Sequence, residues 1–153
     1  MLVGPLVRLL AAAGAIAVLA GCGGDGQPKA PSAAEYRREA SAICVDANRR
    51  AGAIKRPRDL AGLRRFLDQT LVIIEQDTDR LRRLRPPAAL RSGHAAALRV
   101  QDAAIRRLRA LRGELDAAHP SVRALRKGLG EVQRLGDEAD RRFRALGLER
   151  CAQ

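Results

Sequence analysis

Residues 60–87 read LAGLRRFLDQTLVIIEQDTDRLRRLRPP, and this stretch decides the fold class. Its apolar side chains recur every three or four residues, which places them on one face of an α-helix. The double proline Pro86-Pro87 ends the helix, because proline lacks an amide hydrogen and its ring clashes with the preceding turn. The stretch therefore predicts one long amphipathic helix that needs partners. The stripe comprises Leu60, Leu63, Leu67, Leu71, Ile74, Thr78 and Leu81, widened by Phe66, Ile73 and Leu84.

Three further segments share this periodicity. The preceding helix begins with Ser32-Ala33-Ala34-Glu35, a capping-box pattern, and ends at Lys55-Arg56-Pro57. Asp59 is the expected N-cap of the helix over 60–85. The third helix starts at the double proline and ends at His119-Pro120-Ser121, and the fourth ends at Gly147, with Leu148 packing back. The inward residues of the first helix are Tyr36, Ala40, Ile43, Cys44, Ala47 and Ala51. Those of the third helix are Leu90, Leu98, Ile105, Leu108, Leu111 and Leu115. Those of the fourth helix are Val122, Leu125, Leu129, Val132, Leu135, Ala139, Phe143 and Leu146.

Short connections make consecutive helices antiparallel neighbours. We therefore expect an all-α fold, an antiparallel up-down-up-down four-helix bundle. A three-helix bundle with the first helix draped across it is the alternative. Composition agrees with the class, since alanine, leucine and arginine are strong helix formers and the pattern contains no strand signal.

The first 22 residues, MLVGPLVRLLAAAGAIAVLAGC, have a different character. Residues 9–20 are an unbroken apolar run with the length of a signal-peptide core, whereas a membrane-spanning helix needs about 20 residues. The run ends in Leu19-Ala20-Gly21-Cys22, which resembles the lipobox of bacterial lipoproteins. The resemblance implies cleavage between Gly21 and Cys22 and a diacylglycerol on the Cys22 thiol. A plain secretory signal and an uncleaved anchor are the alternatives.

This resemblance implies three parts of the chain. Residues 1–21 are the signal peptide, residues 22–31 are the lipidated cysteine and a Gly/Pro tether, and residues 32–153 are the helical-bundle domain. Two acyl chains give stable anchoring, where one gives only reversible binding. The expected location is the extracytoplasmic face of the cell membrane, with the membrane itself as a partner through the lipid on Cys22.

Export leaves two cysteines, Cys44 and Cys151, in an oxidising compartment, which predicts a disulfide between them. The bond would close a loop of about 107 residues and stabilise by about 4 kcal/mol in the chain-entropy model. The position of Cys44 makes this bond difficult, because the end of the fourth helix should lie beside the start of the first. Cys44 lies about 17 Å along the first helix from its start, at about 1.5 Å per residue. Either the first helix is displaced along the bundle or the C-terminal tail folds back.

The chain as a whole resembles small helical lipoproteins of high-GC Gram-positive bacteria. The features that carry this resemblance are the lipobox, the tether, the Ala40-x-x-Ile43-Cys44-x-x-Ala47 helix, the double proline and the terminal Gly147-Leu148-x-x-Cys151. The resemblance covers most of the chain and implies no established activity.

The formal net charge is +12, and only three of the 29 basic residues are lysines. A basic surface can recruit polyanions, but an arginine-rich, lysine-poor composition also follows from high-GC coding bias. Acids precede arginines by four residues at Asp79–Arg83, Asp102–Arg106, Asp137–Arg141, Glu138–Arg142 and Asp140–Arg144, which predicts a self-paired, solvated face. Nucleic acid is not an expected partner, because stacking platforms need aromatic residues and the chain has three.

The sequence contains no motif for catalysis, metal binding or haem attachment, so we expect no enzyme activity, no cofactor and no metal. His94 lies on the inward stripe, where it could join Gln101 and Asp77 in a polar patch of the core, or simply be a hydrogen-bonded histidine. The favoured function is a membrane-anchored module that binds a partner or ligand without catalysis. The alternative is an envelope structural protein whose arginine-rich faces bind anionic lipids or wall polymers.

Overall fold

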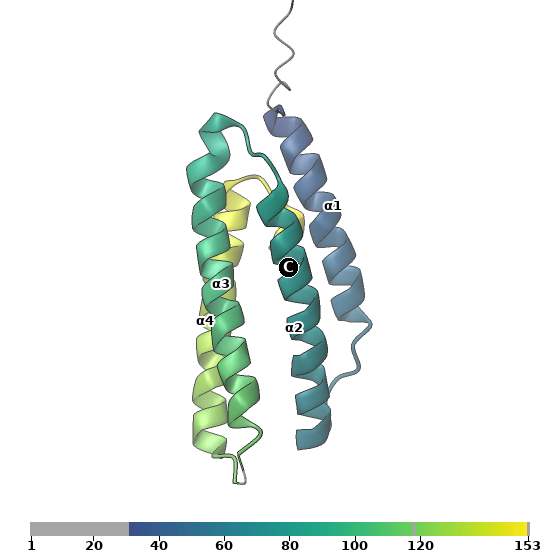
Figure 1. The fold of residues 1–153 in the computed structure, drawn as a ribbon, viewed down its shortest axis with the longest axis vertical. Coiled ribbons are helices and arrows are strands. Elements are labelled where there is room, and N and C mark those ends of the chain that lie inside the picture. The colour runs from purple at the N-terminus through teal and green to yellow at the C-terminus, as the bar shows by residue number, and fades with distance from the viewer. Residues whose placement is uncertain (1–30, 118, 153) are drawn as a thin grey trace, which may run out of the picture.

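The computed structural model describes residues 31–117 and 119–152, and these form an all-helical bundle. The predicted signal peptide, Cys22 and most of the predicted tether lie outside the described residues. Consecutive helices run in opposite directions (Figure 1), so the predicted four-helix bundle is confirmed. The elements are α1 (Ala33–Gly52), α2 (Leu60–Arg83), the 3₁₀ turn η1 (Ala88–Leu90), α3 (Arg91–Glu114), α4 (Val122–Ala145) and the 3₁₀ turn η2 (Glu149–Cys151).

The helix starts follow from local capping chemistry. Ser32 and Glu35 form the complete capping box at the start of α1, and the Asp59 carboxylate accepts the Gly62 amide at 2.5 Å at the start of α2. Ser121 caps α4 by accepting the Ala124 amide. The start of α3 differs from the prediction, because η1 intervenes between the double proline and Arg91.

The core consists of two clusters of buried side chains. One contains residues of α1, α2, α3, α4 and the tail, among them Tyr36 and Phe143. The other joins α2, α3 and α4 only, and comprises Leu67, Leu108, Leu111, Leu115 and Leu125. The bundle therefore has four helices at one end and fewer at the other.

Three large apolar residues predicted to face inward are exposed at the second end, and Ala51, also predicted to face inward, is exposed near the end of α1. Leu60 is 50% exposed, Leu129 is 45% exposed and Val122 is 69% exposed. The physical reason is that α1 is shorter than the other helices and ends at Gly52, before the level at which α2 begins (Figure 1). No fourth helix is present there to cover the ends of α2 and α4.

The C-terminal tail turns back along the bundle at Gly147, whose φ is 74°. The Leu148 amide donates to the Phe143 carbonyl at 3.0 Å and the Gly147 amide donates to the Arg144 carbonyl at 2.8 Å, which is the Schellman motif. Leu148 is completely buried. Figure 1 shows the yellow tail reversing from the end of α4.

The reversal brings Cys151 to α1, where it forms a disulfide with Cys44. The two Cα atoms lie 4.9 Å apart, within the normal range for a disulfide. The predicted pairing is confirmed. Of the two arrangements that could bring Cys151 to Cys44, a displaced first helix or a folded-back tail, the folded-back tail is the one observed. The Asn48 side-chain amide supports it by donating to the Arg150 carbonyl at 2.8 Å.

Gly128 marks a close approach of α4 to α3, which gives a matched pair of substitutions. A Cβ at Gly128 would lie 2.5 Å from Arg107 Nη2 and 2.9 Å from Leu111 Cδ1, whereas one at Gly130 meets nothing within 4 Å. We expect Gly128→Ala to lower the free energy of unfolding by about 1–3 kcal/mol. Gly130→Ala should raise it by about 0.5–1 kcal/mol, because alanine favours the helix. Urea unfolding of both variants checks the opposite signs, and equal effects would contradict the close approach.

Candidate functional site

The three residues of the predicted polar patch fall in two places. Asp77 and Gln101 line the same cavity between the helices, with a volume of about 280 Å³. His94 does not line this cavity; its ring Nδ1 lies 2.8 Å from the Tyr36 hydroxyl. The buried Asp77 carboxylate is bound by Arg50 at 2.5 Å and Arg80 at 3.1 Å, so its charge is compensated.

The Tyr36–His94 pair links α1 to α3 inside the core. Burial raises the pKa of Tyr36 to about 12, and burial lowers the pKa of His94 below 6.5. Burial thus favours the protonated hydroxyl and the neutral imidazole, which share one hydrogen bond between the Tyr36 hydroxyl and His94 Nδ1. The two rings meet edge to face, with centroids 5.6 Å apart. This is the hydrogen-bonded histidine that the sequence left as the alternative to a shared patch.

The lowered pKa of His94 predicts a loss of stability on acidification. The unfolded chain binds the proton more tightly than the folded one, so the stability is present above pH 6.5 and is lost as the pH falls toward the folded pKa. We expect the free energy of unfolding to fall between pH 7 and pH 5 in the wild type, and to fall less in His94→Gln. Urea unfolding at both pH values measures this difference. Parallel pH profiles for the two proteins would show that His94 has no such role.

The arginines pair both along their own helices and between helices. Of the five predicted i,i+4 pairs, Glu138–Arg142 forms at 2.7 Å and Asp140–Arg144 is long, at 3.9 Å. The other three acids have different partners: Asp79 binds Arg82 on its own helix, Asp102 binds the same Arg82 across from α3 to α2, and Asp137 accepts from Gln133 on its own helix. Further interhelical pairs are Arg50–Asp77, Arg80–Asp46, Arg109–Glu75, Arg112–Asp68 and Arg107–Glu131.

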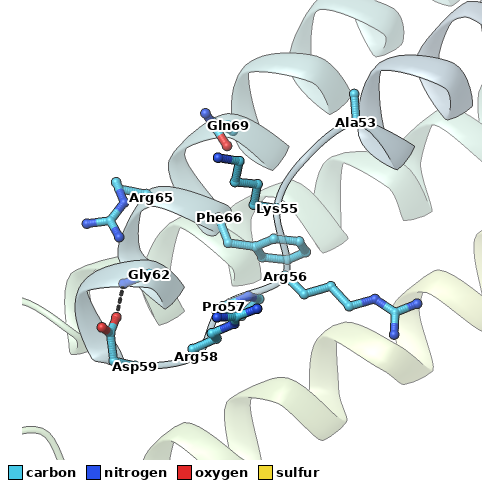
Figure 2. A pocket seen from close by; sticks show the side chains of 10 residues that line it. All are labelled: Ala53, Lys55, Arg56, Pro57, Arg58, Asp59, Gly62, Arg65, Phe66 and Gln69. Carbon is cyan, nitrogen blue, oxygen red and sulfur yellow. Dashed lines mark hydrogen bonds between the residues drawn. The ribbon is translucent and has the colours of Figure 1, made fainter.

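A large hollow lies where the α1–α2 loop returns along α2 (Figure 2). Its volume is about 1060 Å³, and it occupies the end of the bundle that α1 does not reach. Figure 2 shows the Phe66 ring extending from α2 toward the loop, over Pro57, with Arg65 and Gln69 on the α2 side. The short α1 thus creates a concave surface that the remaining three helices leave open.

Four cations line this hollow: Lys55, Arg56, Arg58 and Arg65. All four are exposed, and none makes an ion pair with a described residue. The single acid in the lining, Asp59, accepts the Gly62 amide as the α2 cap. We call these ten lining residues, 53–69 in sequence, the basic hollow. Its excess of positive charge is not neutralised within the described part of the chain.

An apolar groove adjoins the basic hollow and shares Ala53 and Gln69 with it. Ile54, Val72 and Ile73 line this groove, and Val72 is 53% exposed. Sequence reasoning missed this site. In the sequence, Lys55-Arg56-Pro57 indicated only a helix end. A loop that carries three cations between two helices was the signal available.

No group of three or more histidine, cysteine, aspartate or glutamate side chains in the described residues could hold a metal ion. Among those residues, none of the helices is long and apolar enough to cross a membrane. Comparison of the chain with protein-family models, with curated proteins and with solved structures finds no match in any of the three.

Proposed function

We propose that this protein is a lipid-anchored, extracytoplasmic binding module that docks an acidic partner protein at the basic hollow, without catalysis. The observation that carries the proposal is the basic hollow itself: four cations without ion partners among the described residues, beside an exposed apolar groove. Charge complementarity steers and selects a partner, while apolar contacts supply affinity. An acidic segment with apolar side chains matches both surfaces.

The position of the basic hollow supports a partner beyond the membrane. The proposed anchor Cys22 precedes α1, and the hollow follows α1, at the other end of a 20-residue helix. Such a helix is about 30 Å long. A protein tethered at its N-terminus therefore presents the basic hollow outward, toward the envelope.

The alternative is an envelope structural protein whose arginine-rich faces bind anionic lipids or wall polymers. The interhelical pairs weigh against broad faces of this kind, because Arg80, Arg82, Arg107, Arg109 and Arg112 already bind acids of neighbouring helices or of their own. The apolar groove also favours a protein partner, because a polyanion gains little from contact with the exposed apolar side chain of Val72.

A charge reversal with a matched control tests the proposal. Arg56→Glu/Arg58→Glu alters the basic hollow, and Arg83→Glu/Arg85→Glu makes the same charge change at the end of α2, where neither arginine pairs with a described residue. The full-length variants are crosslinked in native membranes and co-purified, with mass spectrometry of proteins and polymers. We expect the wild type and the control to retain an acidic protein at 150 mM salt, and the hollow variant to lose it at least about tenfold.

Two further variants separate the alternatives. Val72→Ser should weaken capture of a protein but leave capture of a polyanion unchanged. Cys22→Ala should release the protein from the membrane fraction if the lipid is the anchor. Recovery of wall polymer or anionic lipid, lost equally in both charge reversals, would favour the structural alternative and reject docking at the basic hollow.

A further inference from the structure

The basic hollow and the apolar groove follow one continuous face of α2. The residues of α2 on this face recur every three or four positions, the spacing of a single helix face. They are Gly62, Arg65, Phe66, Gln69, Val72 and Ile73. The end of α1 and the loop after it line the opposite side of both depressions. Together they form one valley, here called the α2 valley, which is about 17 Å long at about 1.5 Å per residue.

The α2 valley lies where α1 no longer accompanies α2. The two helices are antiparallel, and Arg50 of α1 binds Asp77 of α2. Because both helices rise by about 1.5 Å per residue, Gly52 at the end of α1 lies about level with Glu75. The stretch of α2 before this level is about 20 Å long and has only the loop beside it on this side (Figure 1). A neighbouring helix is therefore missing along this stretch.

The α2 valley suits a helix better than an extended peptide. Within residues 31–117 and 119–152 there is no β-strand, so the valley offers no sheet edge with which an extended backbone could pair. The amides of an extended peptide would lose water there without gaining partners, which is costly. A helix satisfies its own backbone, and its side-chain ridges pack between those of α2.

Unpaired positive charge and apolar surface occupy different ends of the α2 valley. The four cations of the basic hollow lie toward the start of α2, where the positive end of the helix dipole adds to their attraction for acids. At the other end the charged residues are already compensated, because Arg50 binds Asp77 and Asp68 binds Arg112. An occupant therefore needs acidic residues at one end and apolar residues at the other.

We propose that the α2 valley docks an amphipathic helix of the acidic partner, about three turns long, which lies along α2 where α1 has ended. Its acidic residues bind the cations of the basic hollow, and its apolar residues contact Ile54, Val72 and Ile73. The proposal rests on the proposed function and specifies the docking segment of the partner. A helix of three turns is about 16 Å long, which matches the α2 valley. Helices that dock in grooves present anchors at this three- and four-residue spacing.

A designed peptide of about 12 residues is the probe. It carries glutamates in its first turn and leucines at three- and four-residue spacing in the following turns. Its binding to the full-length protein in detergent is measured by fluorescence anisotropy. Two versions differ at one central, outward-facing position, which is alanine or proline. We expect the proline version to bind about 100-fold more weakly, because proline disrupts a helix interior but is tolerated in an extended chain.

Substitutions in the protein locate the docked helix. Arg56→Glu/Arg58→Glu should weaken binding of the alanine peptide about tenfold or more, and Val72→Ser should weaken it about fivefold. Val45→Ser is the matched control. Val45 is 50% exposed, close to the 53% of Val72, but it lies on α1 and lines neither depression. This control should bind the peptide as the wild type does.

Three results would overturn the docked helix. Equal binding of the alanine and proline peptides would show an extended occupant. A peptide of the same composition with alternating leucines that bound as tightly would exclude a helical anchor pattern, and absence of binding by every peptide would exclude the site. The proposed function fails separately, when native membranes yield no acidic protein whose capture depends on Arg56 and Arg58. Such capture together with equal binding of the two peptides would reject the helix alone.

Discussion

The Cys44→Ser/Cys151→Ser double variant should lose about 4–5 kcal/mol of its free energy of unfolding. The disulfide joins residues 107 positions apart, and in the chain-entropy model a loop of about 100 residues is worth about 4.7 kcal/mol. The loss also has a local part, because the bond holds the buried Leu148 and Ala152 against α1 and α4. Urea unfolding under non-reducing conditions measures the total.

Reductant provides the control for this prediction. Reduced wild type should unfold at the same urea concentration as the double variant, and the variant should not respond to reductant. Hydrogen exchange of the Leu148 amide, which donates to the Phe143 carbonyl, should accelerate more than exchange in the middle of α3. A variant within about 1 kcal/mol of the wild type would mean that the tail holds its place without the bond.

Tyr36→Ala should lower the free energy of unfolding by about 3–5 kcal/mol, the usual cost of removing a buried aromatic side chain. Tyr36 is 1% exposed and packs within the cluster shared by α1, α2, α3, α4 and the tail. Its hydroxyl is also the partner of His94. Tyr36 is the largest of the four buried side chains of α1, beside Ala40, Ile43 and Cys44.

Tyr36→Phe separates the ring from the hydroxyl. It keeps the aromatic packing but leaves His94 Nδ1 without its partner, so we expect a loss of about 1–2 kcal/mol. Urea unfolding of the two variants separates the contribution of the ring packing from that of the hydroxyl. A Tyr36→Phe loss as large as that of Tyr36→Ala would show that the hydrogen bond, and not the packing, holds α1.

Local signals in the sequence predict the helix boundaries well. Ser32 with Glu35, Asp59 and Gly147 all act within four residues of their own position, so their capping bonds form as expected. The start of α3 is less well predicted, because a double proline allows either a helix or a 3₁₀ turn after it. The disulfide is predicted because only two cysteines remain after Cys22 is set aside.

The candidate sites are predicted poorly, since each depends on residues that are distant in sequence. Tyr36 and His94 are 58 positions apart, and nothing local distinguishes this pairing from one with Asp77. Arg82 binds Asp79 on its own helix and Asp102 on the next, a choice made by helix register and not by the i,i+4 rule. The exposure of Leu60 and Leu129 likewise follows from the length of α1, a property of the assembled bundle.

The sequence by itself determined the helix class, the four segments, their caps and the antiparallel order, because apolar periodicity, proline and capping bonds act over short distances along the chain. Only the tertiary structure decided the direction of the tail, the partners of the arginines, the basic hollow beside the short α1 and the cavity between the helices. These depend on how far each helix extends and how it is rotated against its neighbours. Such relations are set by the packing of whole helices, which no single stretch of the chain contains.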